Sequence, residues 1–206
     1  MAHITQMSAA DTALLVIDVQ EKLLPLIPDA AALTRNIAFL IDGARLLDMP
    51  VQATEQYPRG LGTTVAELAQ RLPERPDKIA FSSCAIPAVV DQLYREARHK
   101  VVLAGIETHV CVLNTALDLL AQDFRVYIAV DAVGARYRID HDTALRRLEQ
   151  AGAILTTVEG CVFEWIGGAG HARFKEISRL VQQRMQSFSR DPKGSASEER
   201  SPSGRG

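Results

Sequence analysis

A thiol, a carboxylate and an ammonium in this chain stand beside short apolar segments that could bring them to one place. Cys111 follows the apolar run 101–104, and the residues behind it recur at helical spacing. Asp18 lies near the end of the apolar run 13–19, and Lys78 begins a third short apolar stretch. A carboxylate can accept a thiol proton, an ammonium can stabilise both negative charges, and a thiolate attacks electrophilic carbon. These residue types therefore indicate nucleophilic chemistry at Cys111.

Each of these side chains also has an ordinary structural interpretation. A helix start at Cys111 would favour the thiolate through its free N–H groups and positive dipole end, but a lone cysteine is more often a small buried hydrophobe. Asp18 could cap a strand, and Lys78 could be solvated. Three cysteines without a pairing pattern suit a reducing compartment. We rank Cys84 as a distant second candidate and interpret Cys161 as a packing residue.

The elements that must position these residues alternate between strand and helix patterns. Apolar runs covered on both faces, separated by amphipathic segments, are typical of parallel sheets. The pattern predicts an α/β protein, a three-layer α/β/α doubly wound fold with a six-stranded, mainly parallel sheet. In such sheets ligands bind at the carboxyl ends of the strands. Besides the segments named above, the expected strands begin at 51 and cover 125–130 and 153–157, and the expected helices cover 33–47, 88–98, 143–150 and 174–185.

Length and composition place the chain among ordinary globular proteins. Its 206 residues, 47% of them hydrophobic, suffice for one domain, which we assign to residues 1–187. Residues 188–206 are rich in Ser, Gly, Pro and charge, and we expect a disordered polar tail. A net charge of -2 without a dense basic cluster argues against nucleic acid. No signal peptide or membrane span is indicated, so we expect no membrane partner and a cytoplasmic protein.

Two functions from other classes stay open. The segment Gly60-Leu61-Gly62 begins like a dinucleotide fingerprint but lacks the final glycine and follows a proline-containing loop, so a nucleotide-dependent oxidoreductase is weakly supported. The second open function is that of a binding or scaffold protein that kept the fold and lost turnover. Selective alkylation of Cys111 would separate an active nucleophile from both.

Three ordered motifs give the chain a family resemblance. They are LLVIDVQ around Asp18, DKIAFSS around Lys78 and AGIETHVCVLNTALDL around Cys111. With these motifs the chain resembles the isochorismatase-like cysteine hydrolases, and ATEQYPRGLG makes it most similar to the branch of isochorismatase domain-containing proteins. The resemblance implies that Asp18 is the general base, Lys78 the charge-stabilising partner and Cys111 the nucleophile.

The resemblance also implies a non-proline cis peptide before the cysteine, which corresponds here to the bond between Ile106 and Glu107. The backbone amides of Glu107 and Cys111 would then form an oxyanion hole. Candidate substrate-binding residues stand close to the predicted strand ends: Gln20, Glu55, Gln56, Tyr57 and His109.

Departures from the family narrow the chemistry. Nicotinamidases hold a metal with an Asp-x-His arrangement after the second strand, and this chain has no histidine between His3 and His99. We therefore expect no metal and no cofactor. Isochorismatases do without the nucleophilic cysteine, so Cys111 favours cleavage of a C–N bond, amide or carbamoyl, in a small molecule through a thioester. A nicotinamidase or isochorismatase-type hydrolase is the alternative, the substrate stays open, and the family implies a homo-oligomer.

Overall fold

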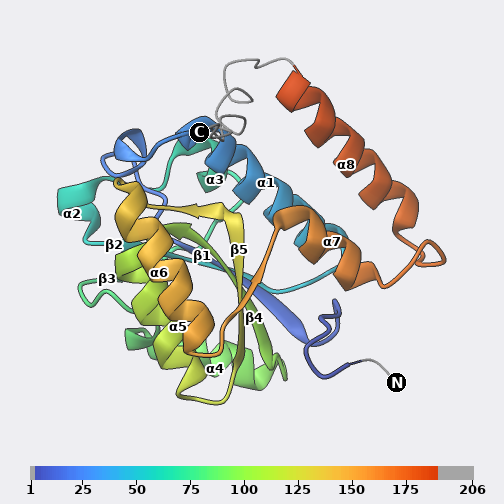
Figure 1. Cartoon of the computed structure of the whole chain (residues 1–206), viewed down its shortest axis with the longest axis horizontal. Coiled ribbons are helices and arrows are strands. Elements are labelled where there is room, and N and C mark those ends of the chain that lie inside the picture. The colour runs from blue at the N-terminus through green and yellow to red at the C-terminus, as the bar shows by residue number, and fades with distance from the viewer. Residues whose placement is uncertain (1–2, 190–206) are drawn as a thin grey trace, which may run out of the picture.

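A computed structural model describes residues 3–189 of the chain. Six strands form one sheet in the order β3-β2-β1-β4-β5-β6, and every pair in it is parallel. The predicted three-layer, doubly wound α/β/α fold is confirmed (Figure 1). The strand order reverses between β1 and β4, where open sheets of this kind bind ligands. The strands are β1 (Thr12–Ile17), β2 (Val51–Gln56), β3 (Asp77–Lys78), β4 (Lys100–Ile106), β5 (Arg125–Gly134) and β6 (Ile154–Thr156).

Helices cover both faces of the sheet. In Figure 1, α1, α7 and α8 lie on one face, and α4, α5 and α6 lie on the other. Two apolar clusters match these layers: one contains Leu40, Val102 and Trp165, and the other contains Leu93, Leu103 and Leu119. The helices are α1 (Ala30–Leu46), α2 (Pro58–Leu61), α3 (Ala66–Ala69), α4 (Pro87–Arg95), α5 (Leu113–Leu120), α6 (Arg138–Gln150), α7 (Val158–Ile166) and α8 (Phe174–Ser189).

Several element boundaries differ from the sequence expectation. Helix α6 begins five residues earlier than the expected 143, and α7 was not predicted although Thr157 caps it by accepting a hydrogen bond from Gly160 N. The strand at Lys78 is only two residues long. Helix α8 continues to Ser189, past the predicted domain end at 187, and the rest of the predicted polar tail lies outside the described residues.

Strands β1 and β4 approach each other closely because the residue of β4 that faces Ile17 is a glycine. Gly105 pairs with Ile17 and has a φ of +124°. A Cβ at this position would lie 2.0 Å from the Ile17 carbonyl oxygen, so only glycine fits there. This contact brings together the ends of the two strands from which Asp18 and Cys111 follow.

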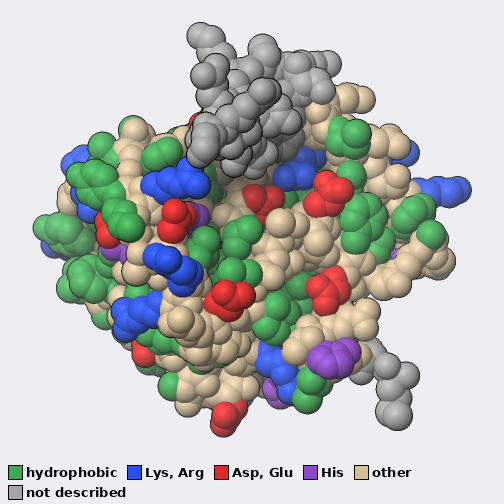
Figure 2. Space-filling view, viewed as in Figure 1, with side chains coloured by type: hydrophobic (Ala, Val, Ile, Leu, Met, Phe, Trp, Pro, Cys, Tyr) green, Lys and Arg blue, Asp and Glu red, His purple; other side chains and the backbone are tan. Residues whose placement is uncertain are grey.

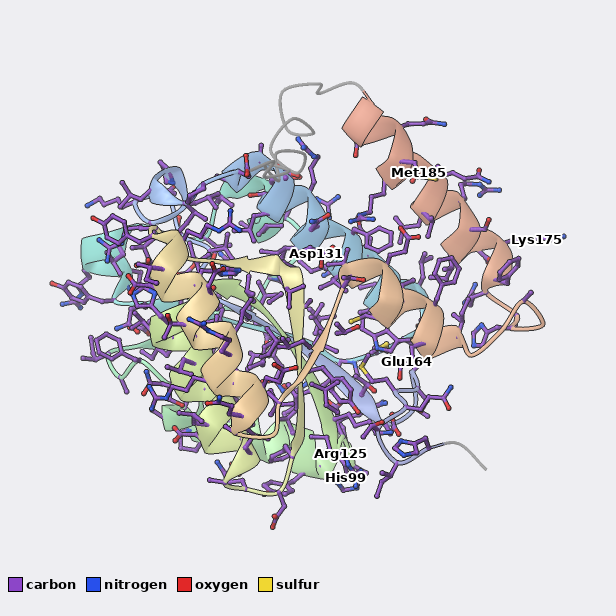
Figure 3. All side chains as sticks on the ribbon, viewed as in Figure 1. His99, Arg125, Asp131, Glu164, Lys175 and Met185 are labelled. Carbon is purple, nitrogen blue, oxygen red and sulfur yellow. The ribbon has the colours of Figure 1, made fainter. Side chains whose placement is uncertain are left out.

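Four helices return to the sheet through very short turns at the edge where the amino ends of the strands lie, opposite the carboxyl ends that carry Asp18 and Cys111. The turns after α1, α4, α5 and α6 each contain one residue with positive φ: Asp48, Ala97, Asp123 and Gly152. In each turn the amide after that residue donates back to the last helical turn, as Arg98 N does to Leu93 O at 2.8 Å. This is the Schellman termination. Figure 3 shows His99 and Arg125 side by side at this edge, where Arg125 N donates to His99 O.

We expect Ala97→Gly to stabilise the protein by about 0.5–1 kcal/mol. Ala97 is exposed and has a φ of 50°, where an L side chain is strained and glycine is not. The greater freedom of glycine in the unfolded chain offsets part of the gain. Urea unfolding of both proteins measures the difference, and Gln70→Gly, at the end of α3 with a negative φ of -63°, is the control in which the same change should not stabilise. Equal or lower stability of Ala97→Gly would contradict the expectation.

Candidate active site

The three residues singled out in the sequence meet at the carboxyl edge of the sheet. Asp18 directly follows β1, Lys78 ends β3, and Cys111 lies in a π-helical turn, Thr108–Val112, after β4. The Lys78 ammonium donates to Asp18 Oδ2 at 2.7 Å, and the two side chains are 2% and 0% exposed. Both lie close enough to Cys111 for their charges to act on its thiol. The structure thus places a buried ion pair beside the cysteine.

Lys78 uses its entire hydrogen-bonding capacity within the protein. Its Nζ atom donates to Asp18 Oδ2 at 2.7 Å, to Gln56 Oε1 at 2.8 Å and to the Phe81 carbonyl oxygen at 2.9 Å. An ammonium has three donors and no acceptor. All three are therefore engaged, which fixes the position of the positive charge.

Asp18 is oriented by its backbone and by a threonine. Its φ of 55° is left-handed, which aspartate tolerates better than most residues, and this turn ends β1 at Ile17. Its amide donates to the carbonyl of Thr54 at 3.2 Å, and the Thr54 hydroxyl donates to Oδ1 at 2.8 Å. One carboxylate oxygen thus faces Thr54 and the other faces Lys78.

A chain of hydrogen bonds that the sequence did not reveal connects Asp18 to Cys111. The hydroxyl of Thr54 lies 3.1 Å from Ser83 Oγ, and Ser83 N donates to Thr115 Oγ1 at 2.9 Å. The Thr115 hydroxyl in turn donates to the Cys111 carbonyl at 2.7 Å. The three linking residues are polar but buried: Thr54, Ser83 and Thr115. Polar residues at otherwise apolar positions were the only sign of this hydrogen-bond chain in the sequence.

Burial opposes the thiolate that the helix start at Cys111 was expected to favour. Burial first, and then the negative charge of Asp18, raise the pKa of Cys111 to about 12, although the positive charge of Lys78 lowers it. The cysteine is the fourth residue of the π-helical turn that begins at Thr108 and continues directly into α5. The thiol is therefore harder to ionise than that of a free cysteine, and it stands next to a carboxylate that can accept its proton.

Glu107 follows a cis peptide and is tied to the neighbouring loop. The bond between Ile106 and Glu107 is cis. The buried Glu107 carboxylate accepts from Arg136 Nε at 2.9 Å and from Arg136 N at 3.1 Å. A second tie joins Thr108 Oγ1 to His141 Nδ1 at 2.9 Å. These contacts fasten the loop after β5 and the first turn of α6 to the turn that carries Cys111.

Two residues expected to contact substrate are instead internal supports. Gln20 is fully buried, and its amide bonds with both backbone groups of Gln56 and with the Gly62 carbonyl. Glu55 Oε1 accepts from Thr64 N, Thr64 Oγ1 and Arg75 Nε. A strand-end polar residue can face inward as well as outward, and the sequence pattern does not distinguish the two directions.

The remaining candidates lie nearer the surface, close to a group of exposed apolar residues after the strand ends, which we call the apolar rim. Tyr57 is 49% exposed, and the His109 side chain is 26% exposed with Nε2 3.8 Å from Asp140 Oδ2. Gln56 is buried but lies within 3.8 Å of the Cys111 sulfur through Oε1. Figure 2 shows hydrophobic side chains gathered at the left edge, where Figure 1 labels α2 and β3. The exposed apolar residues after the strand ends are Leu26, Tyr57, Ile79, Phe81, Tyr137 and Ile139.

Among residues 3–189, no group of three His, Cys, Asp or Glu side chains is arranged to hold a metal ion. No helix within the same residues has both the length and the apolar character needed to cross a membrane.

Solved structures with the same architecture define the fold class. The MAR1 ribonuclease of Caenorhabditis elegans is 42% identical, with a TM-score of 0.82 over 86% of this chain and 93% of that one. The YcaC gene product of Escherichia coli, described as an octameric hydrolase of unknown specificity, is 24% identical, with a TM-score of 0.83 over 94% and 98%. At that identity the second comparison shows the fold alone. The chain thus has the isochorismatase-like hydrolase fold.

Sequence comparisons assign the family. The sequence profile of the isochorismatase domain matches residues 12–160. Isochorismatase domain-containing protein 2A of Mus musculus is 40% identical over 171 residues, which cover 82% of each protein. The chain belongs to the isochorismatase family of hydrolases, as its three motifs predicted.

Proposed function

We propose that this protein is a metal-independent cysteine hydrolase that cleaves an amide or carbamoyl C–N bond of a small molecule through a thioester. The observation that supports this most is the fully buried ion pair of Asp18 and Lys78 at 2.7 Å beside the thiol of Cys111. A buried carboxylate next to a nucleophile is the arrangement that general-base activation requires.

In the first half-reaction, Asp18 takes the thiol proton while the sulfur attacks the carbonyl carbon of the substrate. The new C–S bond converts the carbonyl into a tetrahedral oxyanion. Lys78 remains an ammonium throughout and stabilises the thiolate as it forms. The C–N bond then breaks, the proton on Asp18 passes to the departing nitrogen, and the acyl group stays on Cys111 as a thioester.

In the second half-reaction, Asp18 acts on water. The carboxylate takes a proton from water as its oxygen attacks the thioester carbon, and the C–S bond breaks. The sulfur regains its proton from Asp18, and the acid product leaves. Backbone amides of Glu107 and Cys111 are the proposed oxyanion donors in both steps, and each such donor contributes about 10²–10³-fold to rate in comparable sites.

The substrate class is tested with a panel. The half-exposed Tyr57 and the partly exposed His109 are the proposed substrate contacts, together with Gln56 behind them. The purified protein is incubated with small amides, carbamoyl compounds, nicotinamide and isochorismate, and release of amine or ether product is measured. Mass spectrometry of the Cys111 peptide in the steady state should detect the acyl adduct. Turnover confined to isochorismate, without an adduct, would contradict the proposal.

A second candidate comes from the C. elegans relative, which is described as a ribonuclease and is 42% identical to this chain. RNA cleavage would require close approach to a polyanion, for which the net charge of -2 gives no general attraction. Single-stranded RNA is therefore included in the panel. Cleavage that depends on Cys111 would favour this candidate over the amidase.

Chelation is expected to leave the rate unchanged. A thiol whose proton is taken by Asp18 needs no metal-bound water. Glu55 lies in the stretch where the resemblance implies an Asp-x-His arrangement in metal-binding members of the family, and here it bonds with Thr64 and Arg75. The activity is measured after dialysis against EDTA and again after addition of zinc, iron or manganese. A loss in EDTA that one of these metals restores would return the metal-dependent nicotinamidase alternative to first place.

The protein is further proposed to act as a homo-oligomer in the cytoplasm. The apolar rim provides surface suited to association, and the YcaC relative is described as octameric. Light scattering during size-exclusion chromatography measures the mass of the particle. A scaffold protein without turnover is the alternative, and it predicts that no compound in the panel forms an acyl adduct at Cys111.

A further inference from the structure

Gln56 holds its side-chain amide in one orientation beside the reactive groups. Its Nε2 donates to the Ile79 carbonyl at 2.7 Å, and its Oε1 accepts from Lys78 Nζ at 2.8 Å. A flipped amide would direct N–H groups at an ammonium, which has no acceptor. The oxygen must therefore face Lys78, and the same oxygen lies 3.8 Å from the Cys111 sulfur.

The backbone of Gln56 is fixed as firmly as its side chain. Gln20 Oε1 accepts from Gln56 N at 2.7 Å, and Gln20 Nε2 donates to Gln56 O at 3.0 Å. Gln56 also pairs with Lys78 in the register of β2 and β3. The amide oxygen is thus placed by contacts that do not involve the thiol.

The three acceptors around Lys78 compete with the sulfur for its N–H groups. A thiolate in a buried site needs a hydrogen-bond donor because water is excluded. Lys78 is within reach of Cys111, but its three N–H groups already serve Asp18, Gln56 and Phe81. One of these contacts must loosen before an N–H can point at the sulfur.

We propose that Gln56 is a positioning residue that occupies one Lys78 N–H and thereby keeps Cys111 protonated in the resting enzyme. The inference builds on the proposed cysteine mechanism. When Asp18 takes the thiol proton, it becomes neutral and a weaker acceptor, so the N–H that served Asp18 turns to the sulfur. Gln56 and the Phe81 carbonyl hold the ammonium in place during this exchange. The thiolate then forms only when an electrophile is present to use it.

Few other charges act on the thiol. Asp18 from the end of β1 and Lys78 from β3 are the charged groups that influence Cys111. Glu107 is paired with Arg136, and His109 in the same turn faces Asp140 of α6. The pH dependence of Cys111 therefore reports mainly on Asp18, Lys78 and the acceptor that Gln56 supplies.

The test compares Gln56→Met with Gln52→Met. Both glutamines lie on β2 and are 8% exposed, but Gln52 Nε2 donates to the Val89 carbonyl and has no contact with Lys78. Iodoacetamide alkylation of each cysteine peptide is followed by mass spectrometry from pH 6 to 10. Gln56→Met frees one Lys78 N–H for the sulfur, so Cys111 should react about 3–10-fold faster at pH 8. Gln52→Met should react like the unaltered protein.

The buried Cys161 in the same samples reports on general loosening of the fold. Faster alkylation at Cys111 alone supports the proposal. An unchanged or slower rate at Cys111 in Gln56→Met, or an equal acceleration at Cys161, overturns it. Because alkylation needs no substrate, these outcomes are independent of the proposed function, which fails instead if Cys111→Ala retains turnover.

Discussion

Replacing Cys111 with alanine is expected to lower turnover of the identified substrate by about 10⁴-fold or more, because no other atom can form the thioester. The sulfur is the only part of the side chain that is lost, and Cys111 is 5% exposed in a packed cluster. Steady-state kinetics measure the change in kcat, and a titration of substrate binding shows whether the site still accepts its ligand.

Cys84→Ala is the matched control for the loss of a thiol. Cys84 lies next to Ser83, its Sγ faces the Thr115 carbonyl at 3.9 Å, and burial raises its pKa to about 11. Its hydrogen bonds go to Ser82 and Thr115 rather than to Asp18 or Lys78, and we expect its replacement to change kcat by less than about 3-fold. Comparable losses in both variants would show that the thiols act through structure rather than chemistry.

Replacing Lys78 with methionine is expected to destabilise the protein by about 3–5 kcal/mol at pH 7. The substitution leaves the carboxylate of Asp18, which is 0% exposed, without its counter-charge. It also removes the ammonium donor from Gln56 Oε1 and from the Phe81 carbonyl. Methionine has nearly the shape of lysine, so lost packing contributes little.

The double variant Asp18→Asn/Lys78→Met separates this charge effect from general damage. A neutral amide beside methionine removes the buried unpaired charge, and we expect it to recover about 2 kcal/mol of the loss. Urea denaturation of both single variants, the double variant and the unaltered protein gives the coupling energy. If the double variant is as unstable as the sum of the single variants, the buried ion pair is not the source of the effect.

The sequence predicted the layers of the fold and the meeting of three residues because both follow from strand order. Asp18 and Cys111 come near the ends of apolar runs, and parallel strands end at one edge of the sheet. Lys78 was expected to open an apolar stretch, whereas it ends the two-residue strand β3 at that same edge. The motifs of the family then assigned a role to each. Neither step required contacts between distant parts of the chain to be known in detail.

Long-range contacts decided what the sequence could not predict. The pKa of Cys111 depends on burial and on Asp18, which follows β1. Gln20 faces inward and bonds with the backbone of Gln56, 36 positions further along the chain. Thr54 and Ser83 are 29 positions apart in the sequence, yet their hydroxyl oxygens lie 3.1 Å apart, and no local pattern indicates that they pair.

The Schellman turns described above lie at the edge of the sheet opposite the proposed active site, so this edge can be modified without touching the reactive groups. Residues 47–50, 96–99, 121–124 and 151–153 join helices to strands without contributing a side chain to the proposed site. Loops that carry no function tolerate inserted or attached groups far better than functional ones. A dye, an affinity handle or a surface linker joined at Ala97 or Gly152 would therefore face away from Cys111. An immobilised protein attached in this way would present its reactive edge to solution in a single orientation.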